Sequence, residues 1–217
     1  MTASPDTIKA ARTEWRRRQI VAAATRLLAT RGFHEMSVSD LAVEADISVG
    51  TIYQYVDNKE GVLLLVIQDI LDAYRMEVPS AMSAHTDPLE KVYAGFGAYC
   101  RVVDSRMAGT LLAYRESRTL GRGGLAELKR LEEETTGFLI QSLRDCVEST
   151  ILCQHDSETV GWDLSLLAHM WSLKRWHFGT SMTVDEYIKL QFSVIMAGLV
   201  RKEVHSRYEH LIPSRDK

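Results

Sequence analysis

A run of small, hydroxylated and aromatic side chains without formal charge occupies residues 49–55. Wound into a helix of 3.6 residues per turn, this run would bury one apolar face that includes Val49 and Ile52. Its outward face would consist of Gly50, Thr51, Gln54 and Tyr55. Such side chains can reach phosphates, base edges and thymine methyl groups, and a glycine lets the backbone approach closely. The chemistry predicted for this run is recognition of double-stranded DNA in the major groove.

A preceding helix and a tight turn would hold this run in place. Ser37 followed three residues later by Asp40 has the capping-box spacing of a helix start. After that helix, Ile47 can fill the corner of a turn, and Ser48 is placed to cap the second helix. Two short helices joined in this way predict a DNA-binding helix-turn-helix. Spacing alone would also be compatible with an ordinary helix pair.

Charged residues flank the helix pair on both sides. Asp57 and Glu60 repeat the capping-box spacing and predict the start of the next helix, with Lys59 at the rim of the groove as a phosphate contact. A basic cluster interrupted only by Glu14 precedes the pair and consists of Lys9, Arg12, Arg16, Arg17 and Arg18. Alone, this cluster would indicate a solvated helix face. Beside a helix-turn-helix, it predicts salt-dependent contact with the DNA backbone.

The stretch from Arg16 to Val66 resembles the amino-terminal domain of the TetR family of bacterial transcriptional regulators. The matching residues follow the family's order and spacing: Ile20, Ala23, Ala24, Leu27, Leu28, Gly32, Phe33, Ser37, Asp40, Leu41, Ala42, Ala45, Ile47, Ser48, Gly50, Tyr53, Tyr55, Asn58, Lys59, Leu63 and Leu64. The resemblance implies DNA contacts from Ser37, Ser39, Val49, Gly50, Thr51, Tyr53, Tyr55 and Lys59, to which the basic cluster adds Arg16 and Arg17. Tyr53 lies on the border of the helix faces and is included by resemblance alone.

Composition agrees with a globular protein that acts inside the cell. The chain has 217 residues, 46% apolar and 25% charged, with a formal net charge of −3, which allows one large or two modest domains. The longest apolar run, residues 61–67, is too short to cross a bilayer, and the amino terminus has no signal-peptide pattern. Cys100, Cys146 and Cys153 lack CxxC spacing and fit reduced thiols. We expect a cytoplasmic protein without a membrane segment or a metal site.

The whole chain is predicted to be all-α. About nine helices are expected, over residues 12–30, 37–45, 49–55, 59–78, 88–105, 106–119, 124–150, 158–178 and 183–208, with breaks that include Gly32 and Pro79. A three-helix DNA-binding domain, residues 1–58, would precede a larger ligand-binding and dimerisation domain, residues 59–217. The helix over 59–78 would link the two domains as a lever.

The last two predicted helices, 158–178 and 183–208, carry apolar residues at helical spacing. Resemblance to the family implies that this pair forms a four-helix interface with a second copy, and the small Ala197-Gly198 pair could allow close helix approach. Ordinary core packing is the alternative interpretation of the same pattern. A homodimer is expected, because two helix-turn-helices related by a two-fold axis read a palindromic site.

Cationic and aromatic residues in the second half predict a site for a large anionic effector. The candidates are Tyr114, Arg115, Arg118, Trp171 and Arg175. The segments around them resemble regulators that respond to acyl-CoA thioesters, and Trp171 matches a ligand-contacting tryptophan of the steroid-ring regulators, although Leu167 stands where those have a basic residue. Surface arginines and a core tryptophan are the alternative, as is a hydrophobic drug or another metabolite as effector.

An enzyme is the competing class of function. Residues 121–126 fit a G-x-G-x-x-A dinucleotide pattern but follow a charged helical segment and not an apolar strand. Walker, G-x-S-x-G and H-E-x-x-H motifs are absent, and His169 and His177 lack a partner carboxylate at ligand spacing. The sequence therefore predicts no enzyme and no cofactor. The family resemblance implies a repressor that a small-molecule inducer releases from a palindromic operator, with an activator as the alternative.

Overall fold

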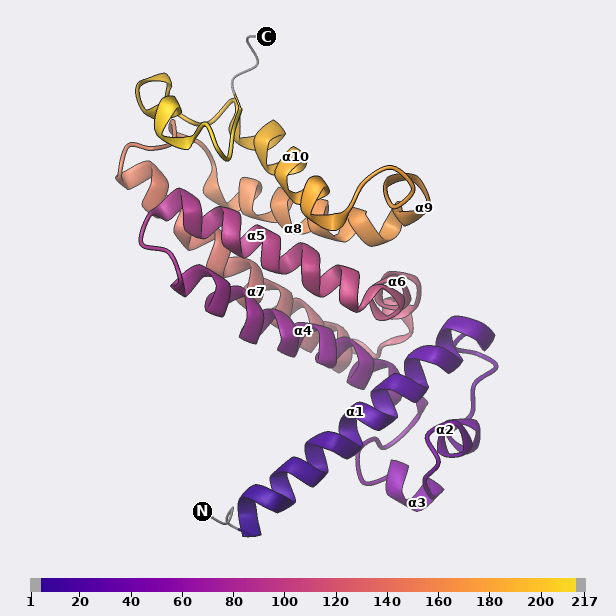
Figure 1. Cartoon of the computed structure of the whole chain (residues 1–217). Coiled ribbons are helices and arrows are strands. Elements are labelled where there is room, and N and C mark those ends of the chain that lie inside the picture. Colours follow the sequence, from indigo (N-terminus) through magenta and orange to yellow (C-terminus); the bar gives the residue numbers. More distant parts are fainter. Residues whose placement is uncertain (1–4, 214–217) are drawn as a thin grey trace. The chain divides into compact units, whose positions relative to one another are not determined.

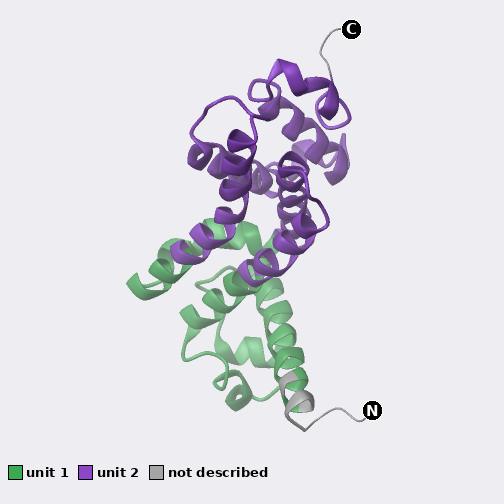
Figure 2. Cartoon of the chain, turned by 90° about the vertical axis from the view of Figure 1, so that its left-hand side faces the viewer, with its two compact units in different colours: residues 1–69, 108–128 green, residues 70–107, 129–217 purple. Residues whose placement is uncertain are grey.

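The computed structural model describes residues 5–213, and every regular element within them is a helix (Figure 1). An isolated antiparallel bridge between Leu152 and Val200 is the one β-type pairing among these residues. The predicted all-α class is confirmed. Contacts divide the chain into two compact units, coloured separately in Figure 2, which interleave along the sequence.

Unit 1 comprises residues 1–69 and 108–128. It contains α1 (Pro5–Arg31), α2 (Val38–Glu44), α3 (Val49–Ile52), the start of α4 (Lys59–Ser83), nearly all of α6 (Met107–Glu116), the 3-10 turn η1 (Ser117–Thr119) and the start of α7 (Arg122–Glu148). Its core includes Ile20, Leu28, Leu41, Ile52 and Leu63, all fully buried. The Gln19 amide of α1 donates to the Ala45 carbonyl over 2.6 Å, which ties α1 to the turn that precedes α3.

Unit 2 comprises residues 70–107 and 129–217. It contains the rest of α4 and α7 together with α5 (Pro88–Ser105), α8 (Ser157–Leu173), α9 (Arg175–Phe178), α10 (Val184–Met196) and the 3-10 helix η2 (Lys202–Tyr208). Helix α5 packs against α8 and α10 and is buried along most of its length. The core of the unit includes Val92, Phe96, Leu139, Leu164 and Phe192.

Local capping chemistry sets the helix starts in unit 1. The predicted capping box is confirmed: Ser37 Oγ accepts from the Asp40 amide over 3.0 Å, and Asp40 Oδ2 accepts from the Ser37 amide over 2.9 Å. Ser48 Oγ accepts from the Thr51 amide over 3.1 Å, so Ser48 caps α3 as expected. For α4 the predicted cap at Asp57 is wrong. The helix begins at Lys59, as predicted, but its cap is Asn58, whose Oδ1 accepts from the Gly61 amide over 2.8 Å.

Several predicted helix bounds are wrong. Helix α1 begins at Pro5 and not at 12, α3 ends at Ile52 and not at 55, and the helix predicted over 158–178 is divided at Lys174 into α8 and α9.

Two further predicted helix ends are wrong for identifiable reasons. Helix α4 continues through Pro79, because Val78 and Met82 are both buried and their packing outweighs the one backbone hydrogen bond that a proline cannot make. Helix α10 ends at Met196, short of the predicted 208, because the chain turns to pair with residues 151–153. The Cys153 amide donates to Leu199 O over 2.8 Å there. Ala197-Gly198 therefore forms a turn and not a helix–helix contact surface.

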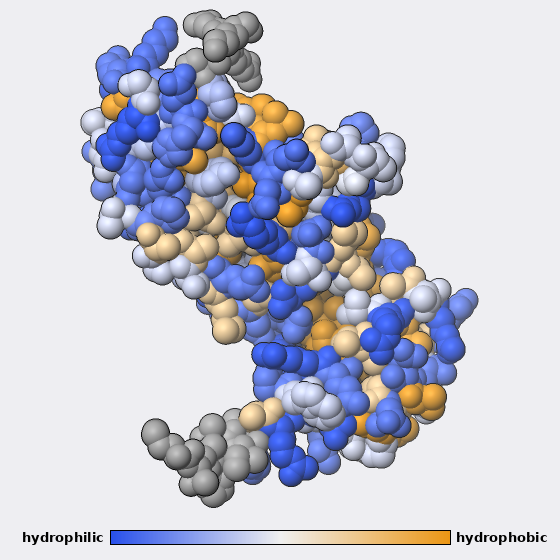
Figure 3. Space-filling view, viewed as in Figure 1, coloured by the Kyte–Doolittle hydropathy of each residue, from blue (hydrophilic) through white to orange (hydrophobic). Residues whose placement is uncertain are grey.

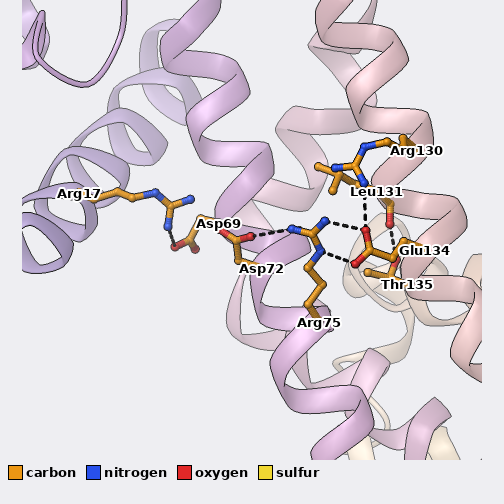
Figure 4. A network of polar contacts seen from close by, with 8 residues as sticks. All are labelled: Arg17, Asp69, Asp72, Arg75, Arg130, Leu131, Glu134 and Thr135. Carbon is orange, nitrogen blue, oxygen red and sulfur yellow. Dashed lines mark hydrogen bonds and ion pairs between the residues drawn. The ribbon is translucent and has the colours of Figure 1, made fainter. Parts of the chain in front are cut away.

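Helix α4 is held by charged side chains in each unit (Figure 4). In unit 1, Arg17 of α1 lies 3.9 Å from Asp69. In unit 2, Arg75 forms a bidentate pair with Glu134 of α7, at 2.9 and 2.6 Å, and this hydrogen bonding lowers the pKa of the Glu134 carboxyl. The helix is therefore fixed at successive turns to different parts of the chain.

Candidate nucleic-acid interface

The outward face of α3 is open to solvent. Gly50 is exposed, Tyr53 is 52% exposed and Ile52 is fully buried, as the helical spacing predicts. Val49 differs from the predicted inward position, because it is 38% exposed at the first turn of a helix only four residues long. Its exposure fits the DNA contact that the family resemblance implies. Tyr53 caps the carboxyl end of α3.

A groove of about 550 Å³ runs between the amino-terminal part of α1 and the α3 segment. Its lining consists of Lys9, Arg12, Thr13, Trp15, Arg16, Thr51, Gln54 and Tyr55. Cations line the α1 side, hydroxyl and amide groups line the α3 side, and none of these described lining residues is acidic. A polyanion with hydrogen-bonding edges is the partner that this lining suits.

Trp15 is a groove residue that the sequence interpretation missed. The residue is 61% exposed, and the Arg16 guanidinium lies 4.9 Å from the centroid of its ring. The position of this tryptophan within the basic cluster could have indicated that it lies on the DNA-binding surface. The stacked pair presents a flat cationic surface to the groove.

A second hollow lies between α2 and α3. It is lined by Ser39, Ala42, Val43, Asp46, Ile47, Ser48 and Val49. Asp46 has a φ of 51°, the left-handed conformation that lets the chain reverse between the two helices. Ser39 and Val49, both candidates for DNA contact, are thereby brought to one surface.

Five predicted DNA contacts are engaged within unit 1. Arg16 Nη1 donates to Gln19 Oε1 over 2.7 Å, and the hydroxyls of Thr51 and Ser48 share a hydrogen bond of 2.8 Å. Lys59 Nζ donates to the His34 carbonyl over 2.8 Å and lies 4.8 Å from the Phe33 ring centroid. Arg17 pairs with Asp69, and the Ser37 hydroxyl donates to Asp40 over 2.6 Å. The geometry gives these residues a role in holding the helices that present α3. Their contact with DNA stays a prediction.

The five predicted effector residues fall in different units. In unit 1, Tyr114 is 46% exposed, Arg118 lies in η1, and Arg115 Nη2 donates to the Leu28 carbonyl near the end of α1 over 2.9 Å. In unit 2, Trp171 is fully buried, and its Nε1 donates to Asp104 over 2.7 Å. Arg175 lies 3.2 Å from the same carboxylate and 4.6 Å from the Trp171 ring centroid. As effector contacts, all five stay predictions.

Arg16 and Arg18 provide a matched test of the groove. Replacing Arg16 by alanine should reduce the slope of log binding constant against log salt concentration by about 0.9, because one phosphate contact is lost. Replacing Arg18 by alanine should leave the slope unchanged, because Arg18 is paired with Glu14 and does not line the groove. Operator titrations at several salt concentrations measure both slopes, and equal effects would contradict the assignment of the groove.

The fold and the groove define a helix-turn-helix DNA-binding protein, and comparison with known proteins gives its family. The family described as bacterial regulatory proteins, tetR family, matches residues 20–66. The HTH-type transcriptional regulator HbdR of Aromatoleum sp. (strain CIB) is 32% identical over 176 residues, which cover 81% of this chain and 77% of that protein. The chain belongs to the TetR family, and it is a DNA-binding transcriptional regulator and not an enzyme.

Solved structures support the fold over most of the chain. The ketosteroid transcriptional regulator KstR2 of Mycobacterium tuberculosis has a TM-score of 0.71 at 18% identity, covering 86% of this chain and 96% of that one. AibR, solved in complex with isovaleryl coenzyme A and operator DNA, has a TM-score of 0.69 at 17% identity and covers 84% and 97%. Regulators of this family bind operator DNA as homodimers and respond to small-molecule effectors.

The described residues contain no cluster of histidine, cysteine, aspartate or glutamate that could hold a metal ion. None of the helices formed by these residues has the length and apolar character needed to span a membrane.

Proposed function

We propose that this regulator represses transcription from a palindromic operator in the cytoplasm and is released by an acyl-CoA thioester. The observation that carries the DNA-binding part is the groove that combines α1 cations with the exposed α3 face. The effector class is supported by AibR, a neighbour in fold solved with isovaleryl coenzyme A. Arg115, Arg118 and Arg175 are candidate contacts for the CoA phosphates, with Tyr114 and Trp171 as aromatic contacts.

The route from effector to DNA would run through the helices that pass from one unit to the other. Helices α4 and α7 each begin in unit 1 and end in unit 2. Residues 108–128 belong to unit 1, where Arg115 joins α6 to the end of α1 through the Leu28 carbonyl. An effector that displaces these helices would change how α3 is presented. By linkage, it must bind more tightly to the form that does not bind DNA.

Exposed apolar side chains on α8 and α10 support dimerisation through these helices. They are Leu166, Leu173, Leu190 and Val194, between 37% and 56% exposed. Figure 3 shows apolar surface over α10. A second copy would cover such side chains, and the resulting two-fold axis would relate two α3 helices to the halves of a palindrome.

The test is fluorescence anisotropy with a labelled DNA fragment from upstream of the protein's own gene. Protein is bound first, and acyl-CoA thioesters of increasing size are then titrated in, with free CoA as the control. Release by one thioester at concentrations where free CoA has no effect would support both parts of the proposal. Binding without release by any thioester would contradict the effector class while leaving the DNA-binding part intact.

A further inference from the structure

A chain of contacts in unit 1, which we name the Gln19 relay, joins the groove to the turn between α2 and α3. It starts where the Arg16 guanidinium lies 4.9 Å from the centroid of the Trp15 ring. Arg16 Nη1 donates to Gln19 Oε1 over 2.7 Å, and Gln19 Nε2 donates to the Ala45 carbonyl over 2.6 Å. In the same unit α1 packs against α2, and α2 packs against α3 (Figure 1). A candidate phosphate contact is thereby connected to the backbone that precedes α3.

The two partners of Gln19 fix the orientation of its amide. A guanidinium can only donate hydrogen bonds, and a backbone carbonyl can only accept them. Gln19 therefore has to turn its oxygen toward Arg16 and its NH2 group toward Ala45, because the opposite orientation would lose both bonds. A side chain of similar volume that has neither group, such as methionine, would break the relay at both ends.

The carbonyl that Gln19 holds lies at the point where the chain leaves α2. Ala45 is the C-cap of α2, and the last carbonyls of a helix need partners from outside the helix. The next residue, Asp46, has a φ of 51°, and the Ile47 amide then donates to the Ala42 carbonyl over 3.0 Å. These contacts set the direction in which the chain enters α3. The bond from Gln19 is the one among them that comes from α1.

At the other end of the relay, Gln19 and the Trp15 ring hold the Arg16 guanidinium in place. A guanidinium has five N–H donors, and the bond to Gln19 uses one of them. Arg16 can therefore bind a phosphate without breaking the relay. A side chain that is already ordered loses less conformational freedom on binding, so this arrangement favours the bound state. It also keeps the guanidinium at a fixed spacing from the turn that precedes α3.

We propose that Gln19 is a positioning residue for operator binding, which fixes the phosphate contact of Arg16 relative to the base contacts predicted for α3. The inference concerns the binding of DNA alone, so it does not depend on the class of effector. It requires the two ends of the relay to be coupled. Loss of Arg16 should loosen the turn after α2, and loss of the Gln19 amide should weaken the contact of Arg16 with phosphate.

Amide hydrogen exchange of the free protein, followed by NMR, tests this coupling without DNA. We expect Gln19→Met to speed exchange of the Ile47 amide roughly 3- to 10-fold, from the loss of one hydrogen bond that holds the turn. Arg16→Ala should also speed it, but should add nothing in the Gln19→Met background. The control Arg18→Ala removes a neighbouring cation that is paired with Glu14, and it should leave the rate unchanged. An unchanged rate in Arg16→Ala would overturn the inference.

Anisotropy titration of a labelled fragment from upstream of the protein's own gene supplies the second readout. Gln19→Met should lower the affinity roughly 3- to 10-fold. Combined with Arg16→Ala, the loss should be smaller than the product of the two single losses by about 3-fold or more, because both changes break the same relay. The matched control Gln141→Met removes an amide that donates to Asp145 over 2.9 Å in unit 2, and it should bind normally. Single losses that multiply, or normal binding by Gln19→Met, would overturn the inference.

Discussion

A leucine in place of Gly50 is expected to lower operator affinity by at least about 100-fold, or about 2.7 kcal/mol, without destabilising the protein. A Cβ at this exposed position would have only Ser48 Oγ, 3.9 Å away, as a neighbour, so a side chain can begin there without a clash. In the complex with DNA, the same side chain would hold α3 away from the base edges on the floor of the major groove. The hydrogen bonds expected from Thr51 and Tyr55 would then be out of reach.

Two glycine variants provide the controls for this prediction. Gly50→Ala adds one methyl group and should cost only a few-fold in affinity. Gly123→Leu places the same large side chain at another open position, on α7, and should leave operator affinity unchanged. Anisotropy titrations and urea unfolding measure affinity and stability separately. Normal operator binding by Gly50→Leu would show that the exposed face of α3 does not read DNA.

The helix-turn-helix was predictable because neighbouring residues determine it. Ser37 and Asp40 cap α2 through side chains three residues apart, and Ser48 caps α3 in the same manner. Such short-range chemistry is visible in a sequence. Where the next residue competes, as Asn58 does with Asp57, the spacing pattern alone selects the wrong cap.

Long-range partners explain what the sequence could not predict. Lys59 has the composition of a phosphate contact, yet its ammonium group is held by the carbonyl of His34, 25 residues earlier. The early end of α10 depends on backbone pairing with residues 151–153. Periodicity identifies which residues are apolar, but it does not say which groups meet across the fold.

Long-range contacts also explain why the two units differ from the predicted domains. The predicted domains are consecutive, whereas contacts place residues 108–128 with the amino-terminal helices. Arg115 is one residue responsible, since it reaches the Leu28 carbonyl 87 positions earlier. The predicted boundary at 58/59 separates residues expected to bind DNA from residues expected to bind the effector. This functional division stays a prediction.

Truncating Trp171 to alanine is expected to lower the free energy of unfolding by about 3–5 kcal/mol. The side chain is fully buried, its ring lies 5.1 Å from that of Tyr187, and its Nε1 donates to Asp104. The variant would leave a cavity and remove one of two donors to Asp104, which keeps its pair with Arg175. Arg175→Ala, which removes the exposed guanidinium above the same ring, should cost far less. Chemical denaturation of the three proteins measures the difference.

The same variants separate the two interpretations of Trp171. If it is a core residue, stability falls as described, and Trp171→Phe, which refills most of the volume, recovers much of the loss and keeps a normal effector response. If it lines the effector site, as the family resemblance implies, Trp171→Phe should raise the effector concentration needed for release even though the protein stays folded. Near-native stability of Trp171→Ala would contradict the core role, because a buried side chain of this size cannot be removed from a packed interior without cost.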